Sequence, residues 1–139
     1  MHFYKSDQEK FKKVRTIREV VFIEEQEVEE RDEFDEYEDS SQHYLMCLDE
    51  KPIGTARWRH VGDKVKLERF AILKDYRGAK NGDALLQKVI EDAAESKKPM
   101  YLHAQLKAIP FYERRGFKKV GNLFLECDIK HYKMELNLT

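Results

Sequence analysis

The chain has 139 residues, a net charge of −1, 41% hydrophobic residues and 12% aromatic residues, which is typical of a folded globular protein. This length suits one hydrophobic core, so we expect residues 1–139 to form a single domain. No apolar run approaches the ~18–20 residues of a membrane span, and the N-terminus lacks the apolar segment of a signal peptide. We therefore expect a cytoplasmic protein with no membrane partner. Cys47 and Cys127 lack metal-site spacing, so no metal is expected.

Charge is distributed unevenly along the chain. Between Glu24 and Asp39 there are eleven acidic residues and one basic residue, Arg31, so this segment carries −10 and the remainder carries +9. The segment could be a solvated acidic loop, or it could attract a cationic substrate. The basic residues form no stripe interleaved with aromatic residues, so nucleic acid is not expected as a partner.

The hydrophobic pattern predicts a short edge strand at 3–5 and then a helix, capped by Ser6 or Asp7, that runs to about Phe22. An acidic loop at 24–41 follows, with at most one helical turn. Further strands are predicted at 43–48, 52–60, 65–73, 99–105, 117–127 and 130–138, and further helices at 81–96 and 108–115. Hairpins followed by a βαβ unit predict an α/β (α+β) fold, with a mixed, mostly antiparallel sheet of about six to seven strands and helices on both faces.

The most informative segment is a basic turn that joins the strand at 65–73 to the helix at 81–96. It reads Tyr76-Arg77-Gly78-Ala79-Lys80-Asn81-Gly82. A helix N-terminus carries free backbone N–H groups and the positive end of the helix dipole, so a turn of this kind binds anions. A pyrophosphate group is the expected ligand.

This turn resembles the cofactor loop of the GNAT superfamily of N-acetyltransferases, whose pattern is Arg/Gln-x-x-Gly-x-Gly/Ala. Arg77 and Gly82 match the two ends of the pattern, but Lys80 stands where the middle glycine is usual. A glycine there allows positive φ and a close approach of the backbone to phosphate. Lysine could instead offer a point charge to the pyrophosphate, or it could weaken the site.

Two further stretches carry the resemblance across nearly the whole chain. The segment 102–117, which includes His103, Gln105 and Tyr112, is similar to the fifth strand of the family and the helix after it. The segment 18–43 and the tail 124–134 resemble a bacterial branch of predicted acyltransferases with poorly defined substrates. That branch commonly has glycine where Asp128 stands, so the last hairpin turn is expected to differ here.

The resemblance implies a GNAT fold and acetyl transfer from acetyl-CoA to a primary amine, by direct attack in a ternary complex. Neither cysteine lies in the matched motifs, which disfavours an acyl-cysteine route. The backbone N–H groups of the central strand would receive the developing oxyanion, and Gln105 stands where the family often has an asparagine that contacts pantetheine. The implied cofactor-binding residues are Phe70, Ala71, Ile72, Arg77, Gly78, Ala79, Lys80, Asn81, Gly82, Asp83, Gln105, Phe111 and Tyr112.

Three catalytic residues are implied: Tyr112, Glu68 and His103. Tyr112 matches the tyrosine that protonates the leaving thiolate, and a phenol with a pKa near ~10 keeps its proton until a thiolate with a pKa near ~8.5 develops. The base stays open between Glu68 and His103, with His43 and His131 as weaker candidates, and the amine could also arrive neutral and need no dedicated base. Either could have a structural role instead, Glu68 in a salt bridge to Arg57, Arg59 or Arg69, and His103 as a hydrogen-bonded strand histidine.

Other functions remain open on the sequence. Lys80 favours a catalytically silent acyl-CoA sensor or interaction module. A nucleotide-binding protein is disfavoured, because the pattern GxxxxGK[ST] is absent. The acceptor could be a small molecule or a peptide amine, and the C-terminal strand pair could offer an edge to a second copy in a homodimer.

Overall fold

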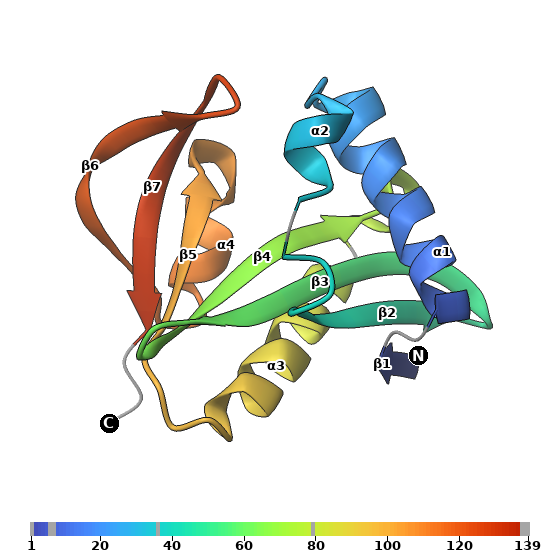
Figure 1. Ribbon diagram of the computed structural model, residues 1–139, viewed down its shortest axis with the longest axis horizontal. Coiled ribbons are helices and arrows are strands. Elements are labelled where there is room, and N and C mark those ends of the chain that lie inside the picture. The colour runs from blue at the N-terminus through green and yellow to red at the C-terminus, as the bar shows by residue number, and fades with distance from the viewer. Residues whose placement is uncertain (1, 6–7, 36, 79, 137–139) are drawn as a thin grey trace.

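The computed structural model describes residues 2–5, 8–35, 37–78 and 80–136. Its strands form one seven-stranded sheet in the order β1-β2-β3-β4-β5-β7-β6, in which β4 and β5 run parallel and every other described neighbouring pair is antiparallel (Figure 1). The predicted mixed, mostly antiparallel sheet is confirmed. Within the described residues, no helix has both the length and the apolar character needed to cross a bilayer.

The elements follow one another in the predicted order, with shifts of one or two residues at most ends. The strands are His2–Lys5 (β1), Gln42–Leu48 (β2), Lys51–Val61 (β3), Lys64–Ile72 (β4), Met100–Gln105 (β5), Lys118–Glu126 (β6) and Ile129–Leu136 (β7). The α-helices are Gln8–Arg18 (α1), Glu30–Glu33 (α2), Asn81–Ala94 (α3) and Ile109–Glu113 (α4). The predicted cap at Ser6 or Asp7 lies outside the described residues.

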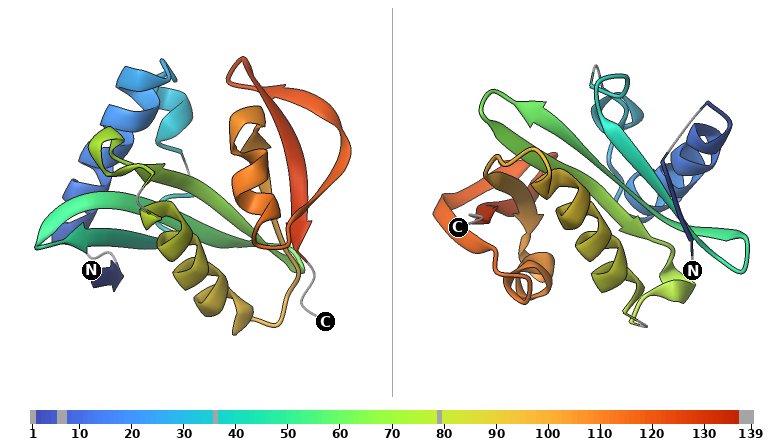
Figure 2. Two further views of the ribbon diagram at one scale, coloured as in Figure 1. Left: turned by 180° about the vertical axis from the view of Figure 1, so that it is seen from behind. Right: turned by 90° about the horizontal axis from the view of Figure 1, so that it is seen from below.

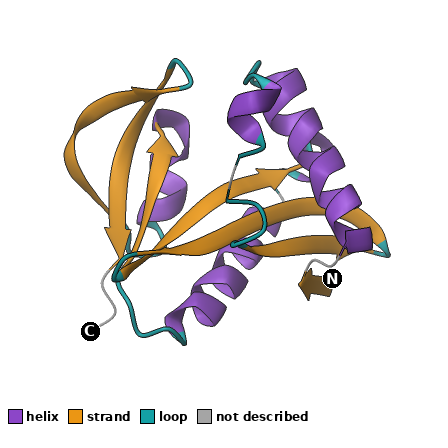
Figure 3. Ribbon diagram, in the orientation of Figure 1, coloured by secondary structure: helices purple, strands orange, loops and turns teal. Residues whose placement is uncertain are grey.

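Helices pack on both faces of the sheet, as predicted (Figures 2 and 3). The alternation of side chains in β2 explains this arrangement, because a strand directs successive side chains to opposite faces. Tyr44 and Met46 belong to the core that α3 covers, whereas Leu45 and Cys47 belong to the core that α1 covers. Both faces of β2 are therefore buried.

The first helix departs from the prediction at its C-terminal end. It continues as a π-helical segment, η1 (Glu19–Glu25), where a regular α-helix was expected. Three β-branched residues, Val20, Val21 and Ile23, fall in this segment. Such side chains crowd the preceding turn of an α-helix and lower its stability slightly.

The acidic segment at 24–41 contains one helical turn, α2, as the prediction allowed. The interpretation of the segment as solvated is wrong for Glu33, whose side chain is only 3% exposed. Arginines from α1, β3 and β4 reach this segment and draw its carboxylates inward, which no local pattern indicates. The segment consequently lies over the end of β4 (Figure 1).

The centre of the sheet opens between β4 and β5. Their register pairs Val65 with Met100 and Lys66 with Tyr101, and the strands then diverge. On the β3 side, β4 contains a bulge at the positive-φ residue Arg69 (φ 59°), because the register advances by three residues in β4 but by two in β3. A bulge bends its strand. The opening and the bulge therefore leave one edge of β4 without a partner strand beyond Lys66.

Candidate active site

A cavity of about 680 Å³ occupies the opening between β4 and β5. Its walls come from η1, the segment after α2, β4, β5, α4 and the β6–β7 hairpin. Eight predicted site residues, spread from residue 68 to residue 112, line it: Glu68, Phe70, Ala71, Ile72, Arg77, His103, Gln105 and Tyr112. Of the described residues in the predicted turn at 77–83, Arg77 is the one that lines the cavity. The cavity has two ends of different character: a cofactor end beside the turn at 76–83, and an acceptor end beside α2 and the segment that follows it.

At the cofactor end, two residues of the turn have positive φ. Gly78 has φ 81°, and a Cβ added there would meet no atom within 4 Å. Lys80 has φ 63° and precedes the first residue of α3, so the lysine adopts the left-handed conformation that a glycine would take freely. The first N–H groups of α3 have no partner within the helix, as at any helix N-terminus. Ala79 lies outside the described residues.

The other residues of the turn hold it in shape. The side-chain amide of Asn81 is buried and donates a hydrogen bond to the carbonyl of Tyr76 (2.9 Å). Asp83 forms an ion pair with Arg114 (3.6 Å). A Cβ on Gly82 would lie 3.4 Å from Cε1 of Phe111, so this glycine lets α3 and α4 approach each other. Among these predicted residues, the side chains of Asn81 and Asp83 are engaged with protein, and their backbone N–H groups remain as candidate ligands.

Two predicted cofactor ligands are held by the end of η1. Arg77 forms an ion pair with Glu25 (Nη2 to Oε2, 2.7 Å), and its Nε donates to the carbonyl of Ile72 (2.7 Å). Gln105 donates from Nε2 to Oε1 of Gln26 (2.8 Å), the residue that follows η1. The π-helical segment thus reaches both residues that are expected to meet coenzyme A.

Tyr112 lines the middle of the cavity and is 9% exposed. Its ring packs edge-on against Phe111 and against Phe70, whose ring centroids lie 5.0 and 6.2 Å away. Burial raises the pKa of its phenol above the ordinary value, so the hydroxyl keeps its proton. Beside it, Phe70, Ala71 and Ile72 line the same cavity on the part of β4 that has left β5.

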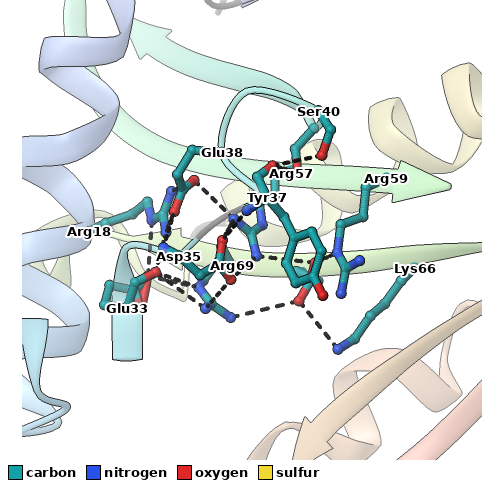
Figure 4. Close-up of polar contacts among 12 residues, drawn as sticks. Arg18, Glu33, Asp35, Tyr37, Glu38, Ser40, Arg57, Arg59, Lys66 and Arg69 are labelled. Atoms are coloured by element: carbon teal, nitrogen blue, oxygen red, sulfur yellow. Dashed lines mark hydrogen bonds and ion pairs between the residues drawn. The ribbon is translucent and has the colours of Figure 1, made fainter. Parts of the chain in front are cut away.

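The acceptor end is built on a network of nine charged residues, drawn in Figure 4 and called here the charge network. It joins five cations to four carboxylates through ion pairs of 2.6 to 3.8 Å. Arg57 is fully buried and contacts three of the carboxylates. The members are Arg18, Glu33, Asp35, Glu38, Arg57, Arg59, Lys66, Glu68 and Arg69.

The network changes the acidity of its carboxyl groups. Burial raises the pKa of Asp35, but hydrogen bonds and the charge of Arg57 outweigh it and lower this pKa to about 2. The pKa of Glu38 is lowered in the same way, because bonds from Arg18 outweigh burial. Burial dominates at Glu33 and raises its pKa. Most carboxylates of residues 24–39 that lie near the cavity therefore already form ion pairs with arginines.

Glu68, one of the two predicted bases, is the hub of this network. Its carboxylate contacts Arg57, Arg59, Lys66 and Arg69 at 2.6 to 3.8 Å. Burial raises its pKa, but these cations, Arg57 first, outweigh burial and lower it. A carboxylate with a lowered pKa is a weaker base toward an ammonium group.

His103, the other predicted base, lies on the opposite wall. Its Nδ1 lies 3.5 Å from Oε1 of Glu126, and its ring meets the edge of Phe124. The hydrogen bond from His103 is the main cause that lowers the pKa of Glu126 to about 2. His131 completes the cluster, with Nε2 3.8 Å from the same carboxylate and Nδ1 donating to the carbonyl of Ile129 (2.6 Å). A carboxylate on one ring nitrogen fixes the tautomer and leaves Nε2 available to accept a proton.

Sequence reasoning gave no role at the site to several polar residues of the cavity, among them Glu25, Gln26, Arg59, Lys66 and Glu126. Arg59 was considered only as one of three arginines that could form a salt bridge with Glu68. Glu25, Gln26 and Glu126 were noted only as parts of segments that resemble the family, without a role of their own. Gln26 and Gln105 are 79 residues apart, so no local pattern pairs them. For Arg59 and Lys66 a weak signal existed, since both stand near Glu68 on strands predicted to be hairpin neighbours.

Comparison with known proteins identifies the architecture. A family model described as the acetyltransferase (GNAT) domain matches residues 6–138. The uncharacterized N-acetyltransferase YjcF of Bacillus subtilis is 35% identical over 130 residues, which are 92% of this chain and 93% of that protein.

Solved structures share the fold. Escherichia coli ElaA superposes with a TM-score of 0.83 at 24% identity, over 97% of this chain and 99% of that one. A GNAT family acetyltransferase from Elizabethkingia anophelis, solved with acetyl-CoA bound, gives a TM-score of 0.71 at 12% identity, over 99% of this chain and 97% of that one.

Proposed function

Because the chain belongs to the GNAT family of acetyltransferases, we propose that it transfers the acetyl group of acetyl-CoA to a primary amine by direct attack in a ternary complex. It is an acyl-CoA-dependent acetyltransferase, as the resemblance implied. The observation that carries the finer proposal is that one cavity joins the cofactor end to the acceptor end, with Tyr112 and His103 both on its wall. Both substrates could therefore be bound at once.

The residues at the cofactor end fit coenzyme A. Acetyl-CoA supplies an acetyl group that is activated as a thioester. Lys80 and the N-terminus of α3 would hold the pyrophosphate, with open backbone at Gly78 and the guanidinium of Arg77 beside them. Gln105 would meet the pantetheine arm in the opening between β4 and β5.

The reaction needs two proton transfers, one from the amine and one to the thiolate, and different residues of the cavity would carry them out. A free alkylamine has a pKa near ~10.4, so it must lose a proton before it attacks. His103 is the better candidate for this base, because Glu126 orients it and because Glu68 is surrounded by four cations. Tyr112 would return a proton to the departing thiolate, since burial keeps its phenol protonated.

Backbone N–H groups of β4 would stabilise negative charge on the acetyl oxygen. Beyond Lys66 the edge of β4 has no register with β5, and the bulge at Arg69 turns Phe70 and Ala71 along the cavity wall. Preorganised N–H donors of this kind contribute ~3–4 kcal/mol of transition-state stabilisation each in well-studied enzymes.

The alternative, a catalytically silent acyl-CoA sensor, is favoured by Lys80, which places a strained lysine where the family has glycine. Calorimetric titration with acetyl-CoA, followed by thiol release from a panel of primary amines, separates the two functions. Saturable binding with thiol release supports the enzyme. Saturable binding without release from any amine supports the sensor, and no binding at millimolar acetyl-CoA contradicts both.

A further inference from the structure

The charge network holds one more positive than negative charge among the described residues. Its cations are three buried or half-buried arginines, Arg59 and Lys66, and its anions are four carboxylates. At the centre, Arg18 bonds to two carboxylates and Arg57 bonds to three, although Nε of Arg57 is buried without a hydrogen-bond partner among the described residues. Arg59 and Lys66 each contact one carboxylate of the network, Glu68, so the surplus charge lies at its edge.

The surplus is exposed to the cavity at Arg59. The Nε of Arg59 donates to Glu68 (2.6 Å), and its guanidinium lies 3.8 Å from the centre of the Tyr37 ring. Among the described residues, the two terminal nitrogens of Arg59 have no hydrogen-bond partner. Lys66 lies beside it, with one contact to Glu68 at 3.3 Å, and both side chains line the cavity (Figure 4).

A guanidinium that is fixed by a ring and a carboxylate, with its two outer nitrogens free, is a preorganised site for an anionic oxygen group. We propose that the acceptor is a small amine that also carries a carboxylate, and that Arg59, with Lys66 beside it, binds that carboxylate. This inference rests on the proposed function and names the class of its acceptor. A singly charged carboxylate matches the single surplus charge better than a doubly charged phosphate does.

The opposite wall is suited to the amine. Glu126 and His103 line the same cavity across from the charge network, and the Glu126 side chain is 43% exposed. A carboxylate attracts an ammonium group, and a histidine beside it can remove the proton. An acceptor bound at Arg59 through its carboxylate would thus direct its amine toward the proposed base. The acidic segment itself contributes little attraction for cations, because its inward carboxylates are paired.

The test compares acceptors that differ only in the carboxylate. Thiol release is measured with ω-amino acids of two to six carbons, with alkylamines of the same length, and with phosphoethanolamine against ethanolamine. The best ω-amino acid should exceed its alkylamine in kcat/KM by about 10- to 100-fold, the effect of hydrogen bonds to a charged group. Arg59→Gln should remove this preference. Arg59→Lys should retain part of it, because it keeps the charge and loses the planar fork.

Arg15→Gln is the matched control, because Arg15 also lies over an aromatic ring, Phe34, and pairs with two carboxylates, yet stands outside the cavity. It should leave the preference intact. Equal kcat/KM for amino acids and alkylamines, a greater preference for phosphoethanolamine, or equal effects of Arg59→Gln and Arg15→Gln would each overturn the proposal.

A binding measurement keeps this inference separate from the proposed function. The N-acetyl derivative of each ω-amino acid, and the matching N-alkylacetamide, are titrated into protein saturated with coenzyme A. Tighter binding of the acid that Arg59→Gln abolishes supports the carboxylate site even if no amine is acetylated. Equal binding of the acid and the amide contradicts the site even if acetylation occurs.

Discussion

The two ends of the cavity use different means to hold charge. At the cofactor end, the turn at 76–83 presents mainly backbone: an open glycine at 78, a left-handed residue at 80 and the N-terminus of α3. At the acceptor end, nine charged side chains from α1, α2, β3, β4 and the segment after α2 neutralise one another around Arg57. The backbone N–H groups at a helix N-terminus bind anions such as phosphate, and this property changes little when side chains are substituted. The side-chain network can change its specificity by single substitutions.

The largest effect is expected from breaking the acceptor end at its centre. Arg57→Met keeps much of the volume but leaves the carboxylates of Asp35, Glu38 and Glu68 with fewer cations in a buried place. Removing one partner of a buried ion pair costs about 3–5 kcal/mol, so the free energy of unfolding should fall by this amount in urea denaturation. Arg15→Gln, at an exposed pair, should cost less than about 1 kcal/mol. If Arg57→Met and Arg15→Gln lowered the free energy of unfolding by similar amounts, the buried charge network would not stabilise the fold more than an exposed ion pair does.

A substitution where the two ends meet should affect turnover without affecting cofactor affinity. Tyr112→Phe removes only the hydroxyl, and general-acid catalysis contributes at least about 100-fold. We expect kcat to fall by about this factor, while the calorimetric Kd for acetyl-CoA stays unchanged. Phe117→Leu, at another ring that packs edge-on against Tyr112 and is not a predicted site residue, serves as a packing control. Full turnover in Tyr112→Phe would rule out the acid role.

Acid should weaken the acceptor end through its paired carboxylates. The pKa of Asp35 is about 2 in the folded chain against 3.8 ordinarily, so its contribution to stability is complete above about pH 4 and is lost as pH falls toward 2. Glu38 and Glu68, whose pKa values are also lowered, act in the same direction, whereas Glu33, whose pKa is raised, acts in the opposite one. Urea denaturation between pH 5 and pH 2 should therefore show a loss of stability that Asp35→Asn reduces. Asp63→Asn, on an exposed turn, is the control, and parallel curves for both variants would contradict the assignment.

The link between η1 and the cofactor end predicts a gain of affinity. Glu25 occupies Arg77 and competes with a phosphate for the same guanidinium. Glu25→Gln should tighten acetyl-CoA binding about two- to fivefold, since a partly exposed ion pair is worth about 0.2–1 kcal/mol. Glu24→Gln removes the same charge one residue away and should have a smaller effect. Weaker binding by Glu25→Gln would mean that Glu25 supports the loop and does not compete.

The smallest effect concerns the conformation of the turn itself. Lys80 and Asp128 both have φ near 60°, and Lys80 alone stands in the cofactor loop. Replacing either with glycine should raise the free energy of unfolding by up to about 1 kcal/mol, because the left-handed conformation is strained for other residues. Lys80→Gly should in addition change the Kd for acetyl-CoA, while Asp128→Gly should not. If Asp128→Gly also changed the Kd for acetyl-CoA, the effect of Lys80→Gly could not be attributed to the conformation of the cofactor loop.

What could be predicted from the sequence follows the same division between the two ends. Local patterns predict the turn, the helix after it and the order of the strands, so the sequence was enough to predict the turn from Arg77 to Gly82 at the start of α3. The last hairpin turn was expected to differ from the family at Asp128, and this stays a prediction; in the structure Asp128 has a positive φ, which a glycine would also adopt. Most ion pairs of the charge network join residues 11 to 36 positions apart, and only folding decides which arginine meets which carboxylate. Which nitrogens of Arg59 remain without a hydrogen bond depends on the ion pairs that form in the folded chain, so no pattern in the sequence could predict them.

The position of β7 between β5 and β6 has a consequence for the emerging chain. β7 pairs with β5 through six residues, from Met100 with Leu136 to Gln105 with His131, whereas β5 shares only two register pairs with β4. During synthesis β5 leaves the ribosome before β7, and until Ile129–Leu136 follows, one of its edges has no strand to pair with. Pairing between strands distant in sequence is slow, and unpaired edges aggregate. The wall that carries His103 should therefore be among the last parts to form, and substitutions in β7 should lower the yield of folded protein during expression more than their effect on the stability of the finished protein suggests.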